Sequence, residues 1–218
     1  MKKVKFIVVF LMFTIISCQH TNKNDIEKSN KTVLEFIKSD KMDKDEFWKI
    51  IDYSIANSKN DKLEKEKIIV EKLSAYSPEQ IIEFEIILRQ LIIQADDFKT
   101  MAAQKIIEDY VSDDSYIYFR CWLIGKGEEI YKGTIRNPDF LSDRIAQDDD
   151  FYFEGLLYVA TSAYKIRTGI KEEDESFPRD VAILKGLDYD FVAPPTKGVD
   201  WKEEDLPRTY PKLWRLFN

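Results

Sequence analysis

Apolar residues recur at helical spacing along most of the chain between residues 43 and 169. Asp43 and Glu46 form a capping-box pattern at the start of the first such stretch. The segment Ser77-Pro78-Glu79-Gln80 is a stronger start signal, because it combines an N-cap serine, a proline at the first helical position and a glutamine at the third. Apolar positions then cover so much of the helix circumference that we expect this helix near the centre of the core. They are Ile81, Ile82, Phe84, Ile86, Ile87, Leu88, Leu91, Ile92, Ile93 and Ala95.

Other stretches predict further helices around this one. A charged and solvated stretch, residues 59–67, leads into a helix with Leu63, Val70 and Leu73 on its apolar side. Later stripes predict helices over residues 98–110, 116–127, 128–135 and 153–164. Asp113-Asp114-Ser115 is expected to cap the second of these, and the turn Asn137-Pro138-Asp139 follows the third. Gly169 is expected to end the last of these helices. Since no sustained period-two pattern occurs, the fold class is predicted to be all-α, an irregular multi-helix bundle.

The character of the chain changes after about residue 170. Five of the seven prolines lie between Pro178 and Pro211, interleaved with large aromatic residues. Proline prevents long regular elements, whereas aromatic side chains bury large areas. We expect this proline- and aromatic-rich tail to wrap on the bundle; a mobile partner-binding arm is the alternative.

The first residues resemble a targeting signal. Three lysines precede the apolar run 6–16, which is too short to span a bilayer but suits the core of a signal peptide. Ile15-Ile16-Ser17-Cys18 resembles the lipobox of bacterial lipoproteins, which implies acylation (palmitate or a related fatty acid) of Cys18 and anchoring through its acyl chains. We therefore predict a leader at 1–17, a polar tether at 18–41 and a helical domain at 42–218. An ordinary secretory signal with a chance cysteine is the alternative.

Charge narrows the choice of partners. Removal of the leader takes away three of the 33 basic side chains and none of the 40 acidic ones, so the mature chain carries −10. Such a surface repels phosphate backbones, and we expect no nucleic-acid partner. A basic protein would be attracted. The predicted location is the cell membrane or the outer membrane, with the domain outside the cytoplasm.

Most familiar catalytic chemistry is excluded by composition. The one histidine, His20, falls in the tether, which leaves a nucleophile in the domain without an imidazole base. With Cys18 acylated, Cys121 stands alone and is expected to pack as a small apolar side chain. Asp148-Asp149-Asp150 lacks the spacing of a calcium loop, and we interpret it as complementing a helix dipole. No metal or other cofactor is predicted. A pair of carboxylates distant in sequence stays open as a catalytic site.

Arg120 is the most informative single residue. It lies between Phe119 and Trp122 on an apolar helix, so its guanidinium must find an acid, and we predict Glu154. The first interpretation is an internal ion pair. The second is an anion-binding cleft that combines Arg120 with Trp122, Tyr118 and Tyr131.

Three segments together resemble an uncharacterised bacterial family, domain of unknown function 4240. They are Glu46-Phe47-Trp48 with Ile51-Asp52, then residues 118–127 with Tyr131 and Asn137-Pro138-Asp139, and finally Gly198 to Trp214. The resemblance spans residues 42–217. It implies a small helical domain and no established activity, cofactor or catalytic residue.

Two functional hypotheses follow. The first is a non-enzymatic, lipid-anchored envelope domain that binds a partner through an acidic, aromatic-bearing surface, one form of which is immunity-type protection against a basic toxin. The second is a hydrolase that acts on envelope polymers through carboxylates.

Overall fold

The computed structural model describes residues 40–171 and 174–218. Within these ranges all regular structure is helical, apart from one isolated parallel bridge between Asp97 and Lys197. The predicted all-α class is therefore confirmed. The leader, Cys18, His20 and the tether up to residue 39 lie outside the described residues.

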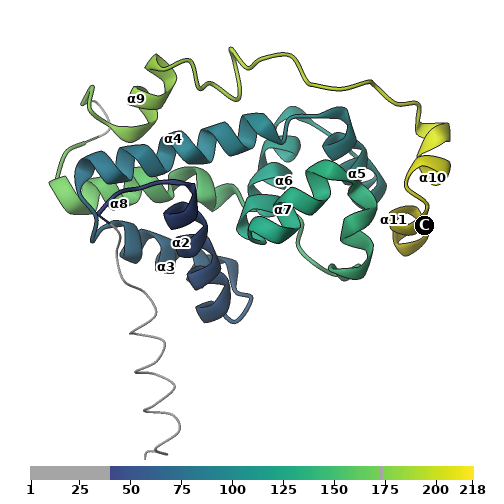
Figure 1. Cartoon of the computed structure of the whole chain (residues 1–218), viewed down its shortest axis with the longest axis horizontal. Helices are drawn as coiled ribbons and strands as arrows, with labels where there is room; N and C mark the ends of the chain where they lie inside the picture. Colours follow the sequence, from purple (N-terminus) through teal and green to yellow (C-terminus); the bar gives the residue numbers. More distant parts are fainter. Residues whose placement is uncertain (1–39, 172–173) are drawn as a thin grey trace, which may run out of the picture. The chain divides into compact units, whose positions relative to one another are not determined.

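The helices follow one another with short connections (Figure 1). The α-helices are α2 (Lys44–Asn57), α3 (Lys62–Leu73), α4 (Pro78–Gln94), α5 (Phe98–Glu108), α6 (Asp113–Gly125), α7 (Glu128–Arg136), α8 (Val159–Thr168), α9 (Pro178–Leu184), α10 (Leu206–Thr209) and α11 (Pro211–Phe217). The 3-10 helices are η1 (Pro138–Asp143), η2 (Glu154–Tyr158) and η3 (Glu203–Asp205).

Helix α4 forms the centre of the core, as its apolar positions predict. Its capping box is complete, with Ser77 and Gln80 each bonding the backbone of the other. It packs against α2, α6, α8 and α9, and Figure 1 shows it lying along α8. Ile81, Phe84 and Ile92 are fully buried. A helix that is apolar on almost every side needs partners on almost every side, and this position supplies them.

Helix α3 turns a different face inward from the one predicted. Its buried residues are Lys65, Ile68, Ile69 and Leu73, while Leu63 is 79% exposed. Lys65, Ile69 and Leu73 recur at intervals of four, so they form one stripe down the helix. The helix packs against α2 and α8 with this stripe.

The stretch around Gly155 departs from the predicted single helix over residues 153–164. The backbone is irregular up to Phe153, forms η2, and becomes α-helical only from Val159. At Gly155 a Cβ atom would meet the carboxylate end of the Glu66 side chain, so a larger residue here would require Glu66 to move. Gly169 adopts a left-handed conformation with φ +73° and ends α8 as predicted.

Two other helix starts were predicted with different success. Ser112 caps α6 instead of the predicted Asp113-Asp114-Ser115, and it shares a capping box with Ser115. Asp43 caps α2 as predicted, through a bond from the Glu46 backbone. The Glu46 carboxylate accepts a hydrogen bond from the hydroxyl of Tyr76, which ties α2 to the turn before α4.

The C-terminal tail wraps on the bundle, as predicted. After α9 it runs as an extended segment across to α10 and α11 (Figure 1). Lys197 exchanges backbone hydrogen bonds with Asp96 and Phe98, and Nε1 of Trp201 donates to the Phe98 carbonyl over 2.8 Å. Leu206 and Leu213 are fully buried. In the described part of the chain, no helix is long and apolar enough to cross a membrane.

Candidate functional site

Arg120 forms an internal ion pair, but with Asp96 at the end of α4. Its Nη1 lies 3.5 Å from Oδ2 of Asp96 and donates to the Ile92 carbonyl over 3.1 Å. The side chain is buried, with its guanidinium 4.4 Å from the centroid of the Tyr116 ring. The predicted partner, Glu154, is wrong: it begins η2 and accepts a hydrogen bond from the Tyr158 hydroxyl over 3.3 Å.

The predicted cluster around Arg120 divides into an internal and an external part. Tyr131 is buried and donates to the Leu91 carbonyl over 2.8 Å, so both it and Arg120 brace the end of α4. Trp122 and Tyr118 belong to the opposite side of α6, where Trp122 lines a pocket and Tyr118 contacts Tyr152. An anion-binding cleft that uses Arg120 is therefore wrong.

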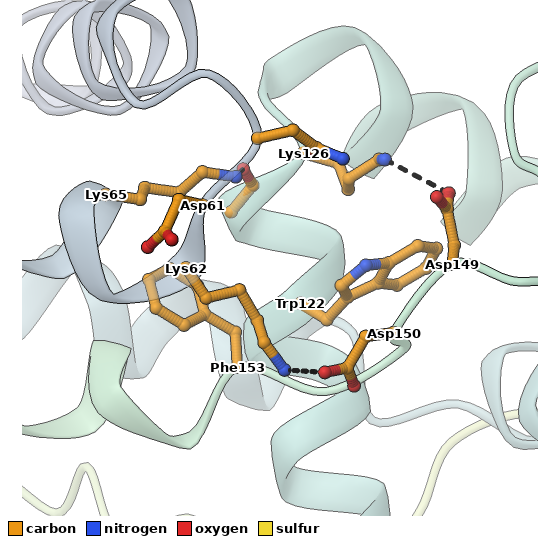
Figure 2. Close-up of a pocket in the computed structure, with 10 residues that line it drawn as sticks. Asp61, Lys62, Lys65, Trp122, Lys126, Asp149, Asp150 and Phe153 are labelled. Carbon is orange, nitrogen blue, oxygen red and sulfur yellow. Dashed lines mark hydrogen bonds and ion pairs between the residues drawn. The ribbon is translucent and has the colours of Figure 1, made fainter.

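The pocket lies where the start of α3, the end of α6 and residues 149–153 meet (Figure 2). It has a volume of about 280 Å³. The rings of Trp122 and Phe153 supply its apolar wall, and the remaining lining is polar. The lining residues are Asn60, Asp61, Lys62, Lys65, Trp122, Gly125, Lys126, Asp149, Asp150 and Phe153.

Two ion pairs flank this pocket. Lys62 of α3 pairs with Asp150, and Lys126, which caps α6, pairs with Asp149 over 3.3 Å. Figure 2 shows the Trp122 ring between the two pairs. The aspartate run therefore binds lysines from two helices, which corrects its interpretation as a helix-dipole complement.

Lys65 is the third lysine of the pocket, and it is only 7% exposed. Its Nζ donates to the Gly125 carbonyl over 3.1 Å, and no carboxylate among the described residues pairs with it. Burial, followed by the charges of Lys126 and Lys62, lowers the pKa of Lys65 to about 8. An appreciable fraction of Lys65 side chains is therefore neutral near pH 8.

A second, wider hollow adjoins the pocket and shares Lys62, Asp150 and Phe153 with it. We name the surface around it the tyrosine face, made of Leu63, Glu66, Tyr118, Tyr152, Glu154 and Tyr158. Tyr152 and Tyr158 are each 45% exposed. Burial and the nearby Glu154 carboxylate raise the pKa of both Tyr118 and Tyr158.

The tyrosine face already holds one cation. The Nζ atom of Lys62 lies 3.5 Å from the centroid of the Tyr152 ring while it pairs with Asp150. A ring face beside a carboxylate is the arrangement that attracts ammonium and guanidinium groups. This surface can therefore recognise basic side chains.

A third hollow, beside Gly127, brings three carboxylates together. Asp52, Glu128 and Glu129 line it, with Lys126 as the one basic residue of the lining. Burial and the charge of Glu128 raise the pKa of Asp52. Glu128 also pairs with Lys132. The Asp52 carboxyl therefore keeps its proton to a higher pH than an ordinary aspartate.

Further buried groups lie away from the pocket. Cys121 is buried as predicted, and burial raises the pKa of its thiol. Glu85 and Arg89 form a buried pair within α4, and Arg89 also donates to the Leu187 carbonyl of the tail. In residues 40–171 and 174–218, no three metal-ligating side chains gather closely enough to hold an ion.

The sequence predicted neither the tyrosine face nor the pocket that Lys62, Lys65 and Lys126 line. Residues 59–67 were interpreted as solvated, although the interval of four between Lys65, Ile69 and Leu73 was a readable signal. The pairing of Glu85 with Arg89 at the same interval was another. The tyrosines at 152 and 158 gave no signal, because an irregular backbone sets their positions.

Comparison with known proteins places the domain in a family. No curated protein and no solved structure matches the chain. Residues 42–166 match the family described as "Protein of unknown function (DUF4240)". The match contains the first two segments of the resemblance and ends before the third, residues 198–214. Because it covers more than half of the 218 residues, the chain belongs to the DUF4240 family.

Proposed function

We propose that this chain is a lipid-anchored cell-envelope protein whose helical domain binds a basic protein partner through the tyrosine face. The anchor rests on the leader and Cys18, which acyl chains would hold to a membrane. The single observation that carries the binding role is the exposure of Leu63, Tyr152 and Tyr158 beside the Glu154 and Glu66 carboxylates.

The chemistry of the tyrosine face favours arginine and lysine. Tyrosine rings and carboxylates together bind a guanidinium through its face and its edge. The contact of Lys62 with the Tyr152 ring supports the proposal, because it places a cation against a tyrosine ring within the chain. A mature net charge of −10 would also attract a basic partner from a distance. Protection against a basic toxin is one form that this binding could take.

A labelled arginine–serine repeat peptide tests the face directly, with a glutamate–serine peptide as its control. We expect the full chain in detergent to bind the arginine peptide, with an affinity that falls as salt rises. Tyr152→Ala with Glu154→Gln should weaken binding about tenfold. Glu204→Gln, an exposed acid on η3, is the matched control and should change little. Equal binding of both peptides, or equal losses in both variants, would contradict the proposal.

The hydrolase hypothesis is supported by one observation, the raised pKa of Asp52 beside Glu128. An acid whose pKa is raised, close to a second carboxylate, suits general acid–base hydrolysis. If this second candidate function holds, the full chain should release fragments from cell-wall polymer, and Asp52→Asn should abolish the release. A native chain without any such release would reject it.

A further inference from the structure

Three lysine side chains line the pocket between α3 and α6, and only two of them have a carboxylate partner. Lys62 pairs with Asp150 and Lys126 with Asp149, whereas Lys65 has the Gly125 carbonyl as its one acceptor among the described residues. Figure 2 shows the Lys65 side chain extending from α3 toward the end of α6. A buried ammonium group with two hydrogens left over is costly unless an acceptor arrives.

The rest of the lining limits the shape and charge of that acceptor. The Trp122 and Phe153 rings form flat apolar walls, and the volume of about 280 Å³ suits a small molecule. Asp61, Asp149 and Asp150 also line the pocket, so a doubly charged phosphate would be repelled. Because the lining holds three lysines and three aspartates, we expect it to accept no more than the single negative charge that Lys65 can pair.

We propose that this pocket binds a small monoanionic carboxylate with a flat apolar body, whose carboxylate pairs with Lys65 while its body lies against Trp122 and Phe153. Carboxylate binding here does not require partner binding at the tyrosine face, although the adjoining hollow shares Lys62, Asp150 and Phe153 with the pocket. A carboxylate would complete the set of lysine–carboxylate pairs around the pocket.

Binding should depend on the charge of Lys65. The charged groups that face this amine are Asp61 and Lys62 from the start of α3, Lys126 from the end of α6, and Asp149 and Asp150 from the connecting segment. A carboxylate is ionised above about pH 5, and Lys65 loses its proton as the pH rises through about 8. Affinity should therefore be constant from pH 6 to 7 and about tenfold weaker at pH 9 than at pH 7.

Benzoate is a suitable probe, with neutral benzyl alcohol as its control. Calorimetric titration of the full chain in detergent should give a millimolar dissociation constant for benzoate and weaker binding of the alcohol. Lys65→Met should weaken benzoate binding at least about tenfold. Lys67→Met is the matched control, because Lys67 is an exposed lysine on the same helix, and it should leave the affinity unchanged.

Several results would overturn the proposal. They are no benzoate binding at 10 mM, equal binding of the alcohol, or equal effects of the two lysine variants. If Lys65→Met does not fold, Lys65→Gln takes its place, and an affinity of that variant for benzoate equal to the native one would show that Lys65 is not the binding group.

Discussion

Arg120, Glu85 and Lys65 are buried charged residues of this domain, and each is balanced differently. Arg120 pairs with Asp96 in the connection between α4 and α5, and Glu85 pairs with Arg89 one turn away. Lys65 has a backbone carbonyl instead of a carboxylate. The sequence showed that Arg120 needed an acid, but it could not identify Asp96, because that partner depends on how α4 and α6 pack.

Replacement of Arg120 by methionine should destabilise the domain strongly. The Asp96 carboxylate would stay buried without its cation, and its Oδ1 already lacks a hydrogen-bond partner among the described residues. We expect the free energy of unfolding in urea to fall by roughly 3–5 kcal/mol. Arg167→Met, at an exposed position on α8, should change it by less than about 0.5 kcal/mol. Similar stabilities for both variants would contradict the internal pairing.

Lys65 should make stability depend on pH in one direction. Its pKa is about 8 in the folded chain and near 10.5 when unfolded, so between these values the unfolded chain binds more protons. Raising the pH from 8 therefore favours the folded state, and the cost of burying the charge is fully present below pH 8. Lys65→Met should be more stable than the native chain at pH 7, by about 1–2 kcal/mol.

That advantage should shrink by about 1 kcal/mol between pH 8 and 9.5, as measured by urea unfolding of both chains at each pH. The comparison cancels other groups that titrate in this range. An advantage that stays constant or grows would show that burial does not lower the pKa of Lys65.

At the scale of the elements, residues close together in the sequence predicted where helices start and which helix is central. Contacts between distant segments determine the parts of the fold that were not predicted. The Ser77–Gln80 capping box and the apolar circumference of α4 each depend on residues that are close together in the sequence. The 3-10 helix η2 packs against α3, with the Glu66 side chain beside Gly155, which is a contact between distant segments. The tyrosine face depends on η2, which is why residue patterns did not predict it.

The extended part of the tail should detach when its anchor is removed. Trp201 holds it through the bond from Nε1 to the Phe98 carbonyl. Trp201→Ala should speed limited proteolysis between α9 and α10 and cost roughly 2 kcal/mol of stability. Phe191→Ala, at a side chain that is 94% exposed in the same segment, is the control and should cleave at the native rate. Equal rates for native and Trp201→Ala chains would contradict anchoring by Trp201.

At the scale of the whole molecule, we propose that a membrane anchor holds an acidic helical domain at the cell envelope. Composition predicted the absence of a histidine-based site in the domain, and the DUF4240 match confirms the family but assigns no activity. Partner binding by the tyrosine face would require the domain to be held at the envelope surface, where it would meet proteins from outside the cell. Acylation of Cys18 is therefore the claim on which the account depends.

Metabolic labelling with a radioactive or clickable fatty acid tests that claim most directly. We predict that the full-length gene product acquires the label and migrates as a processed chain in the membrane fraction. Cys18→Ala should lose the label and stay unprocessed, whereas Cys121→Ala should be labelled like the native chain. A native chain that takes up no fatty acid, or a Cys18→Ala chain that is still labelled, would contradict the anchor.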